Sequence, residues 1–386
     1  MNKIYILGLV VTAFFLGCTS DDLTTAPSPK EDDATIVEAS QDSDVPISFG
    51  IGQSRGSTRT PIEGDFTTSD LAVFCLATGT QTGVTNIPTD IENNNWYNDK
   101  NGELGSLLVR MNNVSASVSL GDVSLSQDYY YPMANWMKYN FYAYYPKQSE
   151  ATFTTTGNQV SVKFTTAIDG IHDIIWGRAY PETNPDPATN HEPYSAKYFR
   201  LAREAAGGGD ISAYYPKFTF EHKLVKFKFF VKATAAAKDA GAKVTKMSIS
   251  NAIKQLNLVV ANKLDTTQNG SLNPAISKTG SLNIKNIKQV DKDKDCFDGT
   301  DAKALTLETS EQEVGYLMLP APPNLPAPES AGFKYHISGT VKFSDTTEQE
   351  ISIDMEPKTQ IPGSDPAEYG FEPGKIYNIL ITIDKN

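Results

Sequence analysis

A cysteine near the N-terminus stands in a setting suited to covalent lipid attachment. Leu16, Gly17 and Cys18 close an apolar run that begins at Ile4 and follows Lys3. This run has the length of a signal-peptide core and is too short to span a bilayer. The pattern predicts a signal peptide over residues 1–17 and a mature chain that begins at lipid-modified Cys18. The alternative is an ordinary secretory signal with an incidental cysteine.

The histidines, which are common catalytic residues, are few and lie in ordinary settings. The chain contains 4 of them. His222 continues a row of apolar residues, His336 alternates with polar ones, and His191-Glu192 lacks the second histidine of a zinc-protease helix. A Gly-x-Ser-x-Gly elbow, a phosphate-binding loop and a dinucleotide fingerprint are all absent from the sequence. We therefore predict that the protein is not an enzyme.

One acidic stretch has the alternation of a calcium-binding loop. Asp291, Asp293 and Asp295 alternate with lysines. However, Cys296 stands where such a loop needs glycine, and Ala302 stands where it needs a bidentate glutamate. The sequence predicts a solvated charged loop here, with no metal site and no cofactor.

Composition limits the class of protein further. The chain has 386 residues and a net charge of −12, which argues against binding to nucleic acid phosphates. A mature chain of this length is enough for about two domains. Cys75 and Cys296 are the cysteines that follow Cys18, and their wide separation favours free thiols over a disulfide, although a disulfide stays open.

The region before residue 60 predicts a flexible stalk, a strand and a loop. Residues 19–44 are rich in Asp, Thr, Ser and Pro and poor in bulky apolar side chains. A half-buried strand is expected next, because apolar residues share one face of an extended segment. They are Val45, Ile47, Phe49 and Ile51. A polar stretch with Arg55 and Arg59 follows and predicts an exposed loop.

The remainder predicts a succession of short strands with turn residues between them. Strands are expected at 71–76, 107–111, 140–145, 160–164, 218–231, 333–343, 351–355 and 377–383, and one short helix at 232–243. The apolar alternation changes phase near Leu224, which predicts a β-bulge. The triple glycine 207–209 suggests a domain boundary nearby. Together these features predict two antiparallel β-sandwiches.

Several segments, in this order, resemble the fimbrillin family, the subunits of type V pili of Gram-negative anaerobes. They are Val45 to Phe49, Thr58-Arg59, Asp70 to Phe74, Trp136 to Pro146, His172 to Gly177, Phe218 to Leu224 and Phe371 to Ile379. The resemblance implies two tandem transthyretin-like β-sandwich domains, at 60–205 and 206–386, after a pro-segment at 18–59. It also implies a lipoprotein precursor, an arginine-specific protease and strand exchange between subunits.

The residues suggest how such an exchange would work. Cleavage after Arg59, or less favourably after Arg55, would remove the strand with Val45, Ile47, Phe49 and Ile51 and leave an apolar groove. A last strand with the same two-residue spacing could fill the groove by pairing along the exposed edge. Its residues are Tyr377, Ile379, Ile381 and Ile383. The alternative is that residues 45–51 remain an ordinary first strand.

The predicted function is thus a structural and adhesive subunit of a cell-surface pilus. The acidic pair Asp21-Asp22 after Cys18 resembles a surface-export signal of lipoproteins and favours the outer face of the outer membrane. Expected partners are other pilus subunits, the membrane through the lipid on Cys18, and a host receptor or glycan. The alternative is a surface lipoprotein that does not polymerise and binds a glycan through the aromatic clusters at 129–131 and 142–145. Shaft, tip and anchor positions all stay open.

Overall fold

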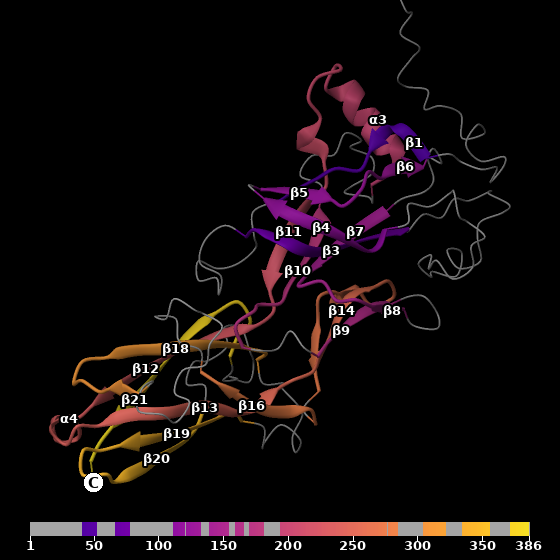
Figure 1. Ribbon diagram of the computed structural model, residues 1–386. Helices are drawn as coiled ribbons and strands as arrows, with labels where there is room; N and C mark the ends of the chain where they lie inside the picture. Colours follow the sequence, from indigo (N-terminus) through magenta and orange to yellow (C-terminus); the bar gives the residue numbers. More distant parts are fainter. Residues whose placement is uncertain are drawn as a thin grey trace, which may run out of the picture.

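The computed structural model describes residues 41–51, 66–77, 111–119, 121–132, 139–153, 159–165, 170–180, 194–275, 277–284, 304–321, 334–355 and 371–385 (Figure 1). Several of the sequence predictions fall outside these ranges. They concern Cys18, Arg55, Arg59, His191-Glu192, Asp291 to Asp295 and Cys296.

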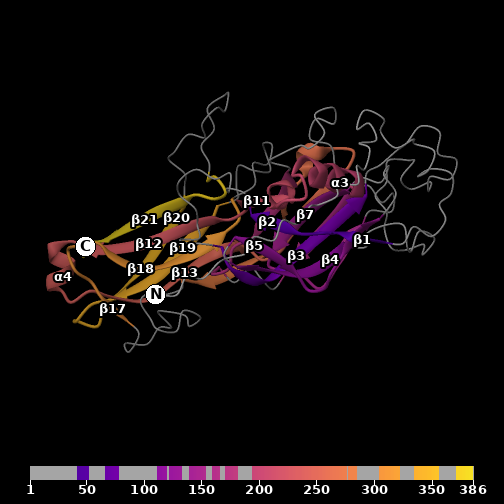
Figure 2. The ribbon, with the colours of Figure 1, turned by 90° about the horizontal axis from the view of Figure 1, so that it is seen from above.

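Strands dominate the described residues, which confirms the prediction of an all-β chain. The first ten strands are β1 (Gln41–Pro46), β2 (Phe49–Ile51), β3 (Thr68–Ala77), β4 (Met111–Ser119), β5 (Asp122–Leu125), β6 (Tyr130–Pro132), β7 (Tyr139–Tyr145), β8 (Ala151–Phe153), β9 (Gln159–Phe164) and β10 (Ile175–Tyr180). The others are β11 (Lys217–His222), β12 (Val225–Ala233), β13 (Lys243–Ile253), β14 (Leu256–Asn262), β15 (Leu272–Pro274), β16 (Thr279–Asn283), β17 (Leu305–Thr306), β18 (Gln312–Leu319), β19 (His336–Lys342), β20 (Glu348–Asp354) and β21 (Ile376–Ile383). They form two groups that lie end to end (Figures 1 and 2).

The first group contains a closed barrel with the strand order β10-β11-β2-β5-β4-β3-β7. Residues 71–76 of β3 are buried on both faces, so this part of the strand shows no alternation of burial. Leu71 and Val73 pack with Phe141 in the core shared by the barrel strands. Ala72 and Phe74 face the opposite way, into a separate core. Apolar residues at each position from 71 to 76 are the expected consequence of two buried faces.

A second sheet, in the order β15-β14-β9-β8, completes that separate core. Strand β14 pairs antiparallel with β9, so that Leu258 lies opposite Val162. Trp176 of β10 also reaches this sheet, because its indole N–H donates to the carbonyl oxygen of Val260 at 2.8 Å. Both β11 and β14 pair with strands that precede residue 206. The domain boundary at 205/206 stays a prediction.

The second group is built from two facing sheets around a third core. One sheet has the order β18-β12-β21, and the other has β16-β13-β19-β20, with β17 also pairing with β13. Burial alternates along β12 as the sequence predicts: Val225, Phe227, Phe229 and Val231 are buried between less buried lysines and Phe230.

At the phase change near Leu224 the chain passes from the first strand group to the second through residues 222–224, which we call the crossing. The prediction of a β-bulge at this point is therefore wrong. Strand β11 ends at His222 in the barrel, and β12 begins at Val225 in the three-stranded sheet. The two apolar rows are out of phase because each faces its own core. A register shift within β12 does occur, opposite β18 between Phe229 and Phe230.

Two strand pairs are parallel, which differs from the predicted purely antiparallel sheets. Strand β2 runs parallel to β11, and β21 runs parallel to β12. Cys75 is free and buried, and burial raises the pKa of its thiol. That agrees with the favoured prediction for this cysteine.

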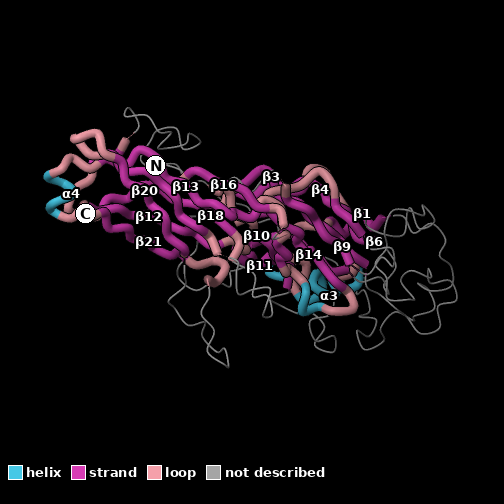
Figure 3. Tube along the Cα trace, turned by 90° about the horizontal axis from the view of Figure 1, so that it is seen from below, coloured by secondary structure: helices cyan, strands magenta, loops and turns pink. Residues whose placement is uncertain are grey.

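The helices are also partly mispredicted. The segment 232–243 contains only the short helix α4 (Ala235–Asp239), and the longer α3 (Ala196–Ala205) was not predicted. The hydroxyl of Ser195 caps α3 by accepting the Tyr198 N–H at 3.1 Å. Figure 3 shows α4 at one end of the molecule and α3 beside the other strand group. Among the described residues, every helix falls short of the length and apolarity that a bilayer crossing requires.

One glycine at the junction of the sheets gives a testable consequence of this packing. Gly270 has φ +73°, and a Cβ placed on it would lie 2.6 Å from the indole of Trp176. We expect Gly270→Ala to lower the free energy of unfolding by about 3 kcal/mol, from backbone strain plus overpacking. Urea denaturation of the purified chain measures the loss.

Gly121→Ala is the matched control for that variant. Gly121 also has a positive φ, +88°, but nothing lies within 4 Å of a Cβ there. Its cost should be confined to backbone strain, about 1 kcal/mol. Equal losses in the two variants would contradict the tight contact between Gly270 and Trp176.

Candidate functional site

The predicted first strand, 45–51, is divided in the structure, and only its second part closes the barrel. Residues 45 and 46 end β1, which begins at Gln41 within the predicted stalk and pairs with β6, whereas Phe49–Ile51 form β2. Strand β2 lies between β5 and β11, antiparallel to the first and parallel to the second. The Ile51 N–H donates to the Gly121 carbonyl at 2.9 Å, and the Gly50 N–H donates to the Pro216 carbonyl at 3.0 Å. Upstream, the Ile47 N–H donates to the Tyr129 carbonyl at 2.8 Å. Without this segment, β5 and β11 would present unpaired backbone edges to each other.

The apolar side chains of this segment fill the barrel core. Val45 is 1% exposed and Phe49 is 5% exposed, and Ile47 is also buried. The Phe49 ring packs edge-on against Phe141, with centroids 4.9 Å apart, and lies 5.1 Å from Phe218. Ile51, at the end of the strand, is only half-buried. Burial of the three inner side chains is worth roughly 5–9 kcal/mol.

The predicted last strand occupies an edge of its own sheet. Strand β21 pairs in parallel with β12, from Lys226 opposite Ile376 to Ala233 opposite Ile383. Within the described part of the chain, its other edge pairs with no strand. Ile381 and Ile383 are buried, whereas Tyr377 and Ile379 are half-buried against the same core. Leu380 points the other way and is 43% exposed.

Both ends of β21 are fastened by further hydrogen bonds. At its start, the Lys226 N–H donates to the Lys375 carbonyl at 3.0 Å. At its end, the Thr234 N–H donates to the Ile383 carbonyl at 2.8 Å. Beyond it, Lys385 lies 2.7 Å from Asp345, and this contact, with hydrogen bonds from Thr347, holds the pKa of the Asp345 carboxyl well below its usual range.

The first and last strands thus have the same kind of neighbour. Residues 217–233 form β11 and β12 in succession, and each of these strands pairs in parallel with one of the two candidate segments. Both segments present apolar side chains at every second position to a core. The predicted cleavage sites Arg55 and Arg59 lie between Ile51 and Phe66, outside the described residues.

The aromatic clusters do not form an exposed platform. Tyr131, a residue considered for sugar stacking, is 0% exposed and packs against Phe199 with centroids 4.9 Å apart. Tyr142 and Tyr144 are buried as well, and the Tyr144 hydroxyl donates to Asn113 Oδ1 at 2.6 Å. Burial raises the pKa of the Tyr144 hydroxyl. These three rings belong to the cores, so they are not available to stack against a glycan.

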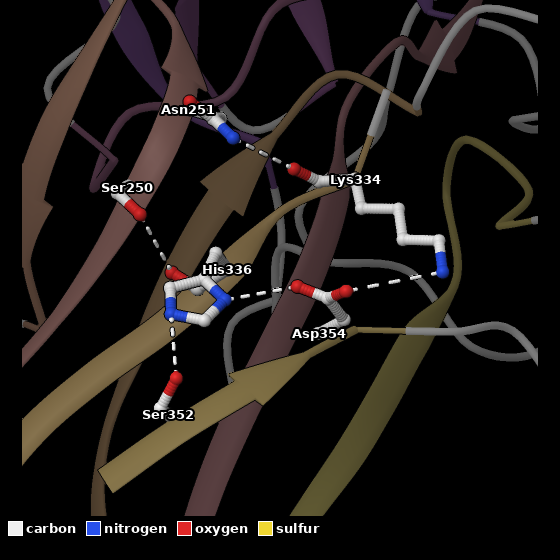
Figure 4. Close-up of polar contacts among 6 residues, drawn as sticks. All are labelled: Ser250, Asn251, Lys334, His336, Ser352 and Asp354. Atoms are coloured by element: carbon white, nitrogen blue, oxygen red, sulfur yellow. Dashed lines mark hydrogen bonds and ion pairs between the residues drawn. The ribbon is translucent and has the colours of Figure 1, made fainter. Parts of the chain in front are cut away.

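One surface cluster contains serine, histidine and aspartate side chains in contact (Figure 4). His336 Nδ1 lies 2.9 Å from Asp354 Oδ1, and its Nε2 lies 3.3 Å from the Ser352 hydroxyl. Lys334 Nζ lies 3.9 Å from Asp354. The strands bring these residues together because His336 is directly opposite Asp354 in the pairing of β19 with β20.

This cluster lacks the surroundings that a catalytic serine needs. Ser352 and Asp354 are exposed, and His336 is partly exposed on the outer face of the sheet. A nucleophilic serine works beside donors aimed at an oxyanion, in a site that excludes water. We therefore assign the cluster as cross-strand polar contacts. In the described ranges, no three His, Cys, Asp or Glu side chains gather as a metal site would require.

A second histidine–aspartate pair is buried at the crossing between the two groups. His222 Nδ1 lies 2.6 Å from Asp173 Oδ2, and the Asp173 side chain is 1% exposed. Burial raises the pKa of the Asp173 carboxyl, while its hydrogen bonds from His222, Ile174 and Leu224 act in the opposite direction. The sequence pattern placed His222 correctly in the core or at its edge but gave no sign of Asp173 as its partner.

Comparison with known proteins finds structural similarity alone. No protein-family model and no curated protein sequence matches the chain. Among solved structures, a candidate cell adhesion protein of Bacteroides uniformis has 13% identity and a TM-score of 0.43, covering 89% of this chain and 95% of its own. A candidate cell adhesion protein of Bacteroides ovatus has 12% identity and a TM-score of 0.41, covering 88% and 92%.

A third solved structure, the tip fimbrial protein Mfa3 of Porphyromonas gingivalis, has 9% identity and a TM-score of 0.33, covering 88% of this chain and 95% of its own. All three neighbours are named as adhesion or fimbrial proteins.

Proposed function

We propose that the protein is a structural and adhesive subunit of a cell-surface pilus, assembled by exchange of a strand between subunits. The observation that carries this proposal is the position of Val45, Ile47 and Phe49. All three side chains fill the barrel core, and Phe49 belongs to β2, the strand that closes the barrel. Their segment is joined to the rest of the chain through residues 52–65, which contain Arg55 and Arg59. One cut after Arg59 would separate that segment from the barrel.

Removal of the segment would create a strong driving force for refilling the groove. Its loss would uncover three apolar pockets and leave the facing edges of β5 and β11 without partners. Unpaired strand edges that flank an apolar groove accept an extended peptide by β-strand addition. In this proposal the incoming peptide is the last strand, Tyr377 to Ile383, of another subunit.

The last strand is suited to this role by its place at a sheet edge. It pairs on one side only among the described strands, and its neighbour is parallel to it, as β11 is to β2. A released β21 would bring Tyr377, Ile379, Ile381 and Ile383 at the two-residue spacing that the groove requires. In this scheme the subunit consists of tandem transthyretin-like domains at 60–205 and 206–386.

The lipid belongs to the precursor in this proposal. Lipid on Cys18 would hold the exported chain at the outer face of the outer membrane, with residues 18–59 as the pro-segment, until cleavage releases the body into the fimbrium. Partners are then the other pilus subunits and a host receptor or glycan. The competing function, a surface lipoprotein that never polymerises, is the outcome if the next two predictions fail.

Cleavage is tested by limited digestion of the purified precursor with an arginine-specific protease. We expect a new N-terminus at Thr60 and a ladder of oligomers that resist SDS, because the emptied groove binds the last strand of another copy. N-terminal sequencing and SDS gels without heating provide the measurements.

Two single-arginine variants sharpen that experiment. Arg59→Ala should abolish the Thr60 terminus and reduce the ladder to what the less favoured cut after Arg55 yields, whereas Arg55→Ala should leave both unchanged. A precursor that is cut after Arg59 but stays monomeric at every protein concentration would contradict strand exchange and favour the non-polymerising lipoprotein.

The donor role of β21 is tested with synthetic peptides that cover residues 375–385. We expect the cleaved protein to bind the unmodified peptide, and Ile381→Asp in the peptide to weaken binding by about 100-fold, since a carboxylate would enter an apolar pocket. Fluorescence anisotropy of labelled peptide measures the affinity.

Leu380→Asp in the same peptide is the matched control. Leu380 lies on the opposite face of the strand and is exposed in the structure. This peptide should bind within a few-fold of the unmodified one. Equal losses for Leu380→Asp and Ile381→Asp would show that the bound peptide does not present one face to an apolar groove.

A further inference from the structure

The buried carboxylate of Asp173 is tied to the chain that crosses between the two strand groups. It immediately precedes Ile174, whose N–H donates to Oδ1 at 2.7 Å. Oδ2 contacts His222 Nδ1 at 2.6 Å, and the Leu224 N–H also donates to the carboxylate. In addition, the Lys223 N–H donates to the Ile174 carbonyl at 2.8 Å. Two of the three groups on the carboxylate thus come from the crossing residues 222–224.

The same crossing residues hold the turn that leads into β21. The Leu224 carbonyl accepts the Gly374 N–H at 2.8 Å. Gly374 has φ +76°, and a Cβ on it would lie 3.6 Å from His222 Cβ. Leu224 is therefore hydrogen-bonded to Asp173 through its N–H and to the turn through its carbonyl oxygen.

This turn sets where the last strand begins. Its Glu372 N–H donates to the Tyr377 hydroxyl at 3.0 Å, and the Phe371 and Tyr377 rings lie 5.0 Å apart. Lys375 then begins the pairing with β12 by accepting the Lys226 N–H. A displacement of Leu224 would shift Gly374, and with it the first residues of β21.

We propose that Asp173 is a positioning residue for the last strand, acting through His222 and Leu224 to hold the turn 371–375 and the start of β21 in place. Loss of its charge weakens the crossing, and β21 then opens locally more often. The link between this opening and assembly rests on the proposed strand exchange. The local opening itself does not.

The test is amide hydrogen exchange on the full, uncleaved chain, so it requires no polymerisation. In Asp173→Asn we expect amides of β21 to exchange on the order of tenfold faster, the loss of one hydrogen bond to a charged group. Amides of β19 in the second group and of β7 in the barrel should keep their rates. Unchanged rates in β21, or equal acceleration in all three strands, would overturn the proposal.

Two further variants separate positioning from general destabilisation. Gly374→Ala strains the turn from the other side and should also accelerate exchange in β21 alone; it replaces Asp173→Asn if that variant fails to fold. Asp354→Asn removes the partner of the exposed His336 and should leave β21 unchanged. A faster β21 in Asp354→Asn, or an unaltered one in Gly374→Ala, would contradict the proposed path.

Discussion

The parallel pairing of residues 217–233 with both the first and the last strand is the constraint on which the architecture depends. Strand β11 closes the barrel only through β2, and β12 carries β21 on its edge. Buried backbone polar groups must be paired. If the barrel loses β2, or the three-stranded sheet loses β21, a strand edge is exposed until another strand pairs with it. Strands β2 and β21 are thus held by one continuous segment.

The two bound strands differ in how firmly they are enclosed. Strand β2 has neighbours on both edges, and its Phe49 is buried, as are Val45 and Ile47 just before it. Strand β21 has one neighbour among the described strands, and Tyr377 and Ile379 keep part of their surface in solvent. An edge strand with half-buried side chains opens at a lower free energy than a strand inside a closed barrel. We therefore expect β21 to open locally more often than β2.

The sequence predicts those features that depend on local alternation. The apolar row from Val45 to Phe49 and the row along β12 are buried as expected. It does not predict features set by distant pairing: β14 beside β9, burial of β3 on both faces, or the change of sheet at Leu224. The sequence does not predict helix α3, although Ser195 is a normal N-cap before it, because a two-residue alternation does not describe helical spacing. Contacts such as Asp173 with His222 depend on register, which periodicity alone leaves open.

The two histidine–aspartate pairs show why geometry has to be weighed with burial. Their nitrogen–oxygen distances are similar, 2.6 Å for His222 with Asp173 and 2.9 Å for His336 with Asp354. The exposed pair can exchange its partner for water, so its net contribution is about 0–1 kcal/mol. Removing one partner from a hydrogen bond to a buried group leaves a polar atom unsatisfied and costs about 1–3 kcal/mol. Asp173 also accepts the Leu224 N–H at the crossing. Its removal would therefore destabilise the place where the barrel, the crossing residues 222–224 and the turn into β21 are hydrogen-bonded together.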